Sequence, residues 1–323
     1  MIRTTRPDPA GFWHAALLYR GEQGFVSGTV PFIREGIDAG EAVLVIVRDP
    51  KIELLRSRLE GDAAKVMFVD MAEVGGNPAR IIPAWSDFVQ EFAGRDRSAR
   101  GIGEPVGPER GADELAECQL HENLLNVAFE PGPTWQLLCP YDMGALSGEV
   151  VEEARRSHPF CVEEGRHQSC CSYPGTERLN EPLHGPLPEP PPGSVELEFE
   201  SGSLAALRQS VFSLAVEGGL DTARATEAVI AVNEVATNSL RHGGGHGALR
   251  AWVDDESVIF EVRDAGVFRE AFVGRTRPGQ DDASGRGLWM VNQLCELVQV
   301  RTSPKGSAVR LHFRGRLLAS SLG

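Results

Sequence analysis

The sequence has little positive charge and no long apolar segment. It has 32 Lys and Arg residues but 46 Asp and Glu residues, so the formal net charge is −14 at pH 7. A nucleic-acid-binding surface needs clustered Lys and Arg, so this balance argues against a broad electrostatic footprint for nucleic acid. No stretch approaches the roughly 18 consecutive apolar residues of a membrane span, and the N-terminus lacks the apolar core of a signal peptide. We therefore expect a cytoplasmic protein with no direct contact to nucleic acid or membrane.

Cysteine is also scarce, with six residues in the chain. Without a secretory signal, reduced thiols are the expected state. Three groups have a spacing typical of metal ligands: Cys118 with His121, His158 with Cys161, and His167 with Cys170 and Cys171. Ordinary buried thiols and histidines near helix ends would give the same spacing, so both interpretations stay open.

Proline, by contrast, is concentrated in one place. Seven prolines fall between residues 173 and 194, where they remove backbone donors and favour extended conformations. A chain of 323 residues is long enough for two domains. We predict a first domain at 1–175, a semi-rigid linker at 176–194 and a second domain at 195–323.

Before the linker, short apolar runs alternate with amphipathic segments. We predict strands at residues 14–19, 42–47, 64–70 and 134–142, and helices at 25–40, 50–61, 77–94, 112–129 and 148–157. Pro31 is expected to interrupt the first helix and Pro83 to kink the third. The run at 42–47 is continuously apolar, as in a parallel strand buried on both faces. The alternation predicts a parallel α/β sheet with right-handed crossovers.

After the linker, the order of elements changes. We predict strands at residues 194–200, 247–254, 257–263, 296–302 and 307–313, with helices at 203–217, at 221–242 and from about Gly287. A polar, Gly-rich stretch at 265–286 precedes the last helix. Helices layered on a mostly antiparallel sheet predict an α+β sandwich.

The helix predicted at 221–242 carries polar residues at helical spacing. A helix turns about 100° per residue, so Glu227, Glu234, Asn238 and His242 fall on one stripe about 80° wide. Ala and Val residues fill the opposite side, so the helix is amphipathic. By itself the stripe fits a solvated helix face, and the three glycines after it fit a helix end. A site for a nucleotide and a metal ion is the alternative.

Two later segments favour the site. Asp264 and Gly266 follow a predicted strand directly, and Gly285 and Gly287 precede a predicted amphipathic helix. Glycines at a helix start let backbone N–H groups approach an anion, which the helix dipole also favours. Each pair alone is a weak signal. Their order along the chain, closed by a strand that begins at Ser307, is much more specific.

With these motifs in this order, residues from about 195 to 313 resemble the ATP-binding domain shared by gyrase, MutL and histidine kinases, the Bergerat (GHKL) fold. Within it they are most similar to anti-sigma serine kinases of the RsbW type. The resemblance implies that ATP and Mg²⁺ bind here, with Asn238 as the Mg²⁺ ligand and Asp264 accepting a hydrogen bond from the adenine amine. Glu234, one helical turn from Asn238, would be the catalytic base toward an acceptor hydroxyl.

The same resemblance implies further cofactor-binding positions. They are Gly266 under the base, Gly285, Arg286, Gly287 and Leu288 where a lid meets the phosphates, and His242 and Ser307 at the edge of the adenine pocket. For Ser307, an ordinary strand hydroxyl is the alternative. One position departs from the family: Phe268 stands where a second glycine is usual. This departure favours ATP binding without turnover.

Residues from about 12 to 175 resemble the MEDS sensory domain of methanogen and methylotroph regulators. The resemblance rests on the segments at 14–23, 31–47, 137–146 and 154–159. It implies a RecA-like parallel α/β fold that senses a ligand, with a small molecule as one candidate. No G-x4-G-K-S/T motif follows the first predicted strand, so no phosphate-binding loop is expected in this domain.

Together these resemblances imply an anti-sigma regulatory factor. It would bind a sigma factor and phosphorylate a Ser or Thr of an anti-anti-sigma (STAS) partner under control of the sensory domain, and a homodimer fits the resembled kinases. One alternative is a non-enzymatic ATP-binding sensor, and another is a sensor histidine kinase. The segment at 120–125 holds His121 and Glu122 but lacks the proline of the usual phospho-acceptor box, so self-phosphorylation is disfavoured.

Overall fold

In the computed structural model, the described residues are 11–93, 98–176, 183, 186–254, 257–279 and 285–315. The chain divides into two compact units, Met1–Leu179 and Asn180–Gly323. This division falls within the Pro-rich segment. No helix among the described residues is long and apolar enough to cross a membrane.

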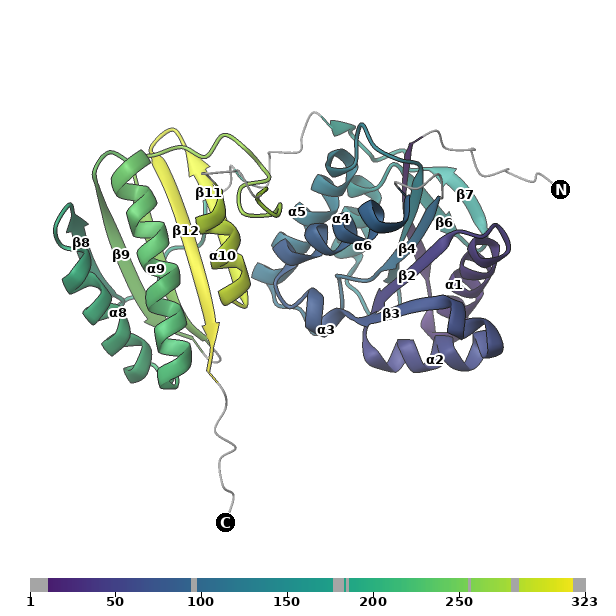
Figure 1. The fold of residues 1–323 in the computed structure, drawn as a ribbon, viewed down its shortest axis with the longest axis horizontal. Coiled ribbons are helices and arrows are strands. Elements are labelled where there is room, and N and C mark those ends of the chain that lie inside the picture. The colour runs from purple at the N-terminus through teal and green to yellow at the C-terminus, as the bar shows by residue number, and fades with distance from the viewer. Residues whose placement is uncertain are drawn as a thin grey trace, which may run out of the picture. The chain divides into compact units, whose positions relative to one another are not determined.

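The N-terminal unit alternates strands and helices along the chain (Figure 1). The elements are β1 Phe12–Tyr19, α1 Gly21–Asp38, β2 Ala42–Val47, α2 Asp49–Leu59, η1 Glu60–Lys65, β3 Val66–Asp70, α3 Met71–Val74, η2 Pro78–Arg80, α4 Ile81–Phe92, β4 Ala99–Gly103, α5 Ala112–Ala128, β5 Trp135–Asp142, α6 Gly148–Ser157, β6 Phe160–Glu163 and β7 Arg166–Ser169.

Seven strands form one sheet in the order β3-β2-β4-β5-β1-β6-β7. All neighbours are parallel except β6 and β7, which form an antiparallel hairpin at the edge. Side chains alternate across the central strand β1: Trp13 and Leu17 pack with α1 and α2, whereas His14 faces α5. Helices therefore cover both faces, which explains why β1 and β2 are almost wholly buried. The predicted parallel α/β class is confirmed.

Strand β4 lies inside this sheet between β2 and β5, although the sequence pattern predicts no strand there. Its sequence is ARGIG, and glycine is a poor strand former. The indole of Trp85 from α4 occupies the space over both glycines. A Cβ on Gly101 or Gly103 would lie 2.8 or 2.9 Å from that ring. The strand is thus held by packing from a neighbouring helix rather than by its own propensity.

Three further sequence expectations for this unit are wrong. Helix α1 runs through Pro31 without interruption. Pro83 lies in the first turn of α4, where a missing N–H is tolerated, so it does not kink the helix. A disulfide joins Cys161 to Cys170 across the β6–β7 hairpin, so not all thiols are reduced.

The C-terminal unit contains eight helices and strands among its described residues. They are β8 Val195–Glu200, α8 Leu204–Glu217, α9 Thr222–His242, β9 His246–Val253, β10 Ser257–Asp264, α10 Arg286–Leu294, β11 Leu297–Ser303 and β12 Gly306–Arg314. The strands form an antiparallel sheet in the order β11-β12-β10-β9-β8. The three helices lie on one face of it (Figure 1), and the apolar core fills the space between the layers. The predicted α+β sandwich is confirmed.

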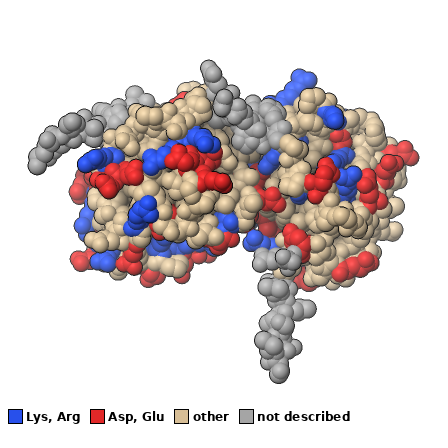
Figure 2. All heavy atoms as spheres, turned by 180° about the vertical axis from the view of Figure 1, so that it is seen from behind, with Lys and Arg blue, Asp and Glu red and all other residues tan. Residues whose placement is uncertain are grey.

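The other face of this sheet carries charged side chains. Glu196, Arg250, Glu261 and Arg310 lie opposite one another on β8, β9, β10 and β12. The end of the Pro-rich segment packs here: Leu187 is buried, and the neighbouring Pro188 carbonyl accepts a hydrogen bond from Arg310. On the face seen in Figure 2, acidic and basic side chains are interspersed.

Candidate nucleotide-binding site

Helix α9 places the polar stripe at the edge of the core. Asp221 caps its start by accepting a 2.8 Å hydrogen bond from the Arg224 amide. The buried side consists largely of Ala and Val, and these small side chains let the helix lie close to the sheet. Glu234 and Asn238 are half-buried, whereas His242, the last helical residue, is exposed. The stripe is therefore open on one side and supported on the other.

Asp264, the last residue of β10, is held by three hydrogen bonds. Its Oδ1 accepts from the Gly266 amide and from the Ser307 hydroxyl, both at 2.8 Å. Its Oδ2 accepts from the Ser239 hydroxyl at 2.5 Å. An ionised carboxylate offers about four lone pairs, so these bonds leave one on Oδ2 for a further donor. The carboxylate is oriented and still able to bind.

Three glycines allow the chain to close around this carboxylate. A Cβ on Gly243 would lie 2.5 Å from Asp264 Cγ, and one on Gly266 would lie 3.1 Å from the His242 carbonyl oxygen. Gly306, opposite the end of β10, would place a Cβ 2.0 Å from the Asp264 carbonyl oxygen. Side chains at these positions would push the carboxylate and its hydroxyl partners apart.

The start of α10 faces the polar stripe of α9. Gly285 adopts the left-handed conformation with φ +86°, which favours glycine, and Arg286 begins the helix. At Gly287 an added Cβ would lie 3.0 Å from Glu234 Oε2 and 3.6 Å from Asn238 Nδ2. Gly287 therefore lies in the first turn of the helix rather than before it, directly against the predicted base and metal ligand.

The structure thus brings the predicted residues together in two groups. Glu234, Asn238 and Gly287 form one, and Asp264, Gly266 and Ser307 form the other. The remaining predicted positions contribute differently. Leu288 is buried in the core, Arg286 is exposed with its Nη2 3.5 Å from the Gly279 carbonyl oxygen, and His242 contributes its carbonyl near Gly266. Within the predicted lid, residues 280–284 lie outside the described residues.

Ser239 is the site residue that sequence reasoning missed. It follows Asn238 directly, yet a helical wheel places it in the middle of the apolar arc of α9, about 140° from Glu234. A polar side chain at the centre of an apolar face needs a partner, and here the partner is Asp264. A serine on the apolar face of the predicted helix was therefore the sequence signal that could have pointed to this contact.

A cavity of about 280 Å³ lies at the same end of the sheet. Asp264 and Ser307 line it, together with Leu187 and Glu189 from the segment before β8. Asp264 is half-buried and lines this cavity, so the residue is not enclosed in the core.

The cysteine and histidine pairs singled out in the sequence do not form metal sites as pairs. Burial raises the pKa of the Cys118 thiol to about 12, and its sulfur donates to the Pro105 carbonyl. Cys161 and Cys170 are joined to each other. His158 belongs to a different group of side chains, which does not include its predicted partner Cys161.

The fold and this geometry agree with comparisons to known families. Residues 13–159 match the family described as MEDS, the MEthanogen/methylotroph, DcmR Sensory domain. Residues 197–313 match the histidine kinase-like ATPase domain. The chain therefore combines a MEDS domain with a histidine kinase-like ATPase domain, as the sequence resemblance implied. The second match implies ATP binding, usually with Mg²⁺, and an ATP-using kinase or ATPase reaction.

Among solved structures, the chain aligns with the RsbU and RsbW domains of Rv1364c from Mycobacterium tuberculosis. The identity is 19%, the TM-score is 0.29, and the alignment covers 38% of this chain and 33% of that chain. The chain thus spans about a third of that structure. No match is found among curated proteins.

The residues present fit MgATP. Asp264 keeps a free acceptor for an amine, Asn238 offers a neutral oxygen to a hard cation, and the first turn of α10 supplies backbone N–H groups for phosphate. Mg²⁺ usually takes few protein ligands beside phosphate and water, so one Asn is sufficient.

Proposed function

We propose that the chain is an anti-sigma regulatory factor that transfers phosphate from ATP to a Ser or Thr of a STAS-type anti-anti-sigma partner. The C-terminal unit would also bind a sigma factor, and the MEDS domain would control both activities in response to a signal, with a small molecule as one candidate. The placement of Glu234 beside Gly287 at the start of α10 supports this proposal most strongly. The Glu234 carboxylate would then lie next to the phosphate that the N-terminus of α10 binds, where an acceptor hydroxyl must also come.

The chain's own groups have separate tasks in this scheme. Bound ATP supplies the phosphoryl group and, with Mg²⁺, neutralises part of its charge. Asp264 binds the adenine, Asn238 binds the cation, and Glu234, as the catalytic base, accepts the proton of the acceptor hydroxyl. Phosphoryl transfer depends mainly on positioning and charge neutralisation, which a rigid α9 with a packed Ala and Val face provides.

A sensor histidine kinase is less well supported. His121, in the segment that resembles an acceptor box, is 1% exposed within α5. A phospho-acceptor must reach the γ-phosphate, which a buried imidazole cannot do. A non-enzymatic ATP-binding sensor remains the second candidate, because Phe268 replaces the second glycine and packs against the core.

One experiment distinguishes the three. The full chain is incubated with γ-labelled ATP and Mg²⁺, with and without a candidate STAS protein. Acid-stable label on the partner is the expected result. Acid-labile label on the chain itself would identify a histidine kinase, and nucleotide binding without transfer to any tested partner would favour the non-enzymatic sensor.

Asp264→Asn is expected to weaken ATP binding by about 10–150-fold. The amide can keep one acceptor oxygen for Gly266 and Ser307, but its NH₂ group would face the adenine amine in place of Oδ2. Loss of a hydrogen bond to a charged group costs about 1.5–3 kcal/mol. Titration calorimetry measures the affinity. Asp221→Asn is the matched control, since Asn caps a helix as well as Asp does. Equal affinities for the two variants would show that Asp264 does not read the base.

A further inference from the structure

Four buried side chains from separate elements meet in the N-terminal unit, away from the nucleotide site. They are His14 on β1, Glu122 on α5, Cys139 on β5 and His158 just after α6, and each is at most 1% exposed. One ligand atom from each lies within 4.8 Å of all the others. Burying polar groups in this density is costly unless they bind one another or a shared partner.

The two imidazole rings are oriented from outside the group. His14 Nδ1 lies 3.0 Å from Asn126 Oδ1, and the Asn126 amide nitrogen donates to the Ser157 and Glu122 carbonyls. His158 Nδ1 lies 2.8 Å from the Ala154 carbonyl oxygen, which can only accept. Both Nδ1 atoms therefore carry the proton in a neutral ring, and both Nε2 lone pairs point inward.

With both rings neutral, this arrangement leaves too few protons at the centre. His14 Nε2 and His158 Nε2 lie 3.1 and 3.3 Å from the same oxygen, Glu122 Oε2. Among the described residues, His158 Nε2 has no hydrogen-bond partner. The Cys139 thiol can supply one proton, to His14 or to Glu122, which leaves the other acceptors facing each other. Protonating both rings would bury two cations whose centroids are 4.1 Å apart.

A metal ion satisfies all four atoms at once. Zinc bonds of about 2.0–2.3 Å to N, O and S at tetrahedral angles imply ligand-to-ligand distances of roughly 3.2–3.6 Å. Four of the distances between these atoms are 3.1 and 3.3 Å from Glu122 Oε2 to the two imidazoles, and 3.4 and 3.6 Å from Cys139 Sγ to His14 and Glu122. These four distances match the edges of a tetrahedral site, and the other two ligand pairs lie within 4.8 Å.

We propose that His14, Glu122, Cys139 and His158 bind a divalent ion of the zinc class. Thiolate, imidazole and carboxylate together favour such a borderline metal over Mg²⁺ or Ca²⁺. The surrounding groups are those that orient metal ligands elsewhere: Asn126 and the Ala154 carbonyl fix the rings, and the Tyr141 hydroxyl donates to Glu122 Oε1 at 3.2 Å.

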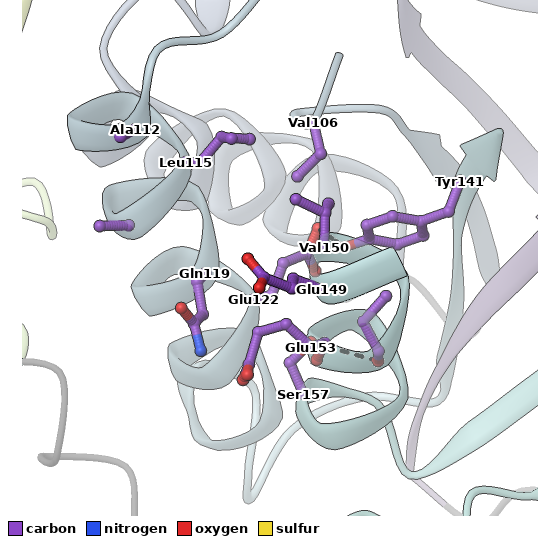
Figure 3. A pocket seen from close by; sticks show the side chains of 12 residues that line it. Val106, Ala112, Leu115, Gln119, Glu122, Tyr141, Glu149, Val150, Glu153 and Ser157 are labelled. Carbon is purple, nitrogen blue, oxygen red and sulfur yellow. Dashed lines mark hydrogen bonds between the residues drawn. The ribbon is translucent and has the colours of Figure 1, made fainter. Parts of the chain in front are cut away.

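The site has a route to solvent. A cavity of about 320 Å³ lies between α5 and α6, and Glu122, Tyr141 and Ser157 form part of its wall (Figure 3). Glu122 is thus shared between the cavity and the group of four. An ion can reach its ligands from the cavity without opening the sheet.

The test uses the full chain without a histidine tag, stripped by a chelator and titrated with Zn²⁺ alone in the absence of nucleotide. We expect one Zn²⁺ per chain by elemental analysis. With Co²⁺ as the probe, we expect a thiolate-to-cobalt charge-transfer band. A wild-type chain that retains no Zn²⁺ at micromolar concentration, or a Co²⁺ spectrum without the thiolate band, overturns the proposal.

Variants then identify the ligands. Cys139→Ser should remove the thiolate band, whereas Cys118→Ser, which changes an equally buried cysteine outside the group, should retain it. Asn126→Ala frees the His14 ring and should weaken Zn²⁺ binding about 10–100-fold. The opposite pattern for the two cysteines would assign the metal to other residues. Far-UV circular dichroism checks that each variant folds, and the wild-type titration stands independently of them.

Discussion

Glu234→Gln is expected to reduce phosphoryl transfer to a protein hydroxyl by about 10²–10⁴-fold, the usual contribution of a general base. ATP binding should change little, because Gln has nearly the same shape and Glu234 does not contact Asp264 or its partners. Gln also fits the space beside Gly287, where a Cβ added to the glycine would lie 3.0 Å from Glu234 Oε2. The effect should therefore appear in turnover and not in affinity.

Transfer of label to a STAS partner at saturating ATP measures turnover, and titration calorimetry measures binding. Glu227→Gln is the matched control, since Glu227 lies on the same stripe of α9 but pairs with Arg224 instead of facing α10. Unchanged transfer by Glu234→Gln would remove Glu234 as the base. Loss of ATP binding by the same variant would instead show that Glu234 holds the nucleotide or its cation.

The sequence could predict which groups of the candidate site lie near one another, because they fall on or at the ends of regular elements. Glu234 and Asn238 share a helix face, Asp264 ends a strand, and Gly287 starts a helix. What it could not give is the hydrogen bonding between elements. That Ser239 and Ser307 hold one carboxylate between them depends on the pairing of β10 with β12 and on how α9 rests on the sheet.

The N-terminal unit shows the same limit more strongly. The alternation of strands and helices predicts a parallel sheet, but β4 exists because Trp85 packs over two glycines, which no local pattern reveals. The four residues around Glu122 lie at positions 14, 122, 139 and 158, so no short sequence motif predicts that they meet. Spacing along the chain suggested cysteine and histidine pairs, whereas the sheet order brings different residues together.

Glu261→Ala is expected to lower the free energy of unfolding of the C-terminal unit by about 3–5 kcal/mol, the cost of removing one partner from a buried ion pair. Glu261 is 0% exposed, and its Oε2 accepts from Arg310 Nε and Nη2 at 2.9 and 2.6 Å. Arg310, itself 4% exposed, would keep only the Pro188 carbonyl among these acceptors. A guanidinium would remain buried without its counter-charge.

Glu196→Ala provides the matched control for this loss. Glu196 lies in the same row of the sheet and pairs with Arg250, but these side chains are 53% and 25% exposed. Exposed pairs contribute about 0–1 kcal/mol, so this variant should unfold almost as the wild type does. Hydrogen exchange of peptides from Ser257–Asp264 and Gly306–Arg314 under increasing urea follows this unit within the full chain.

The double variant Glu261→Met with Arg310→Leu separates the two sources of the loss. Replacing both charges by apolar side chains of similar size removes the uncompensated guanidinium, so stability should return to within about 1–2 kcal/mol of the wild type. Equal destabilisation by the single and double variants would mean that packing, not charge, holds β10 to β12. Recovery would instead show that the unpaired guanidinium of Arg310, and not lost packing, destabilises the Glu261→Ala variant.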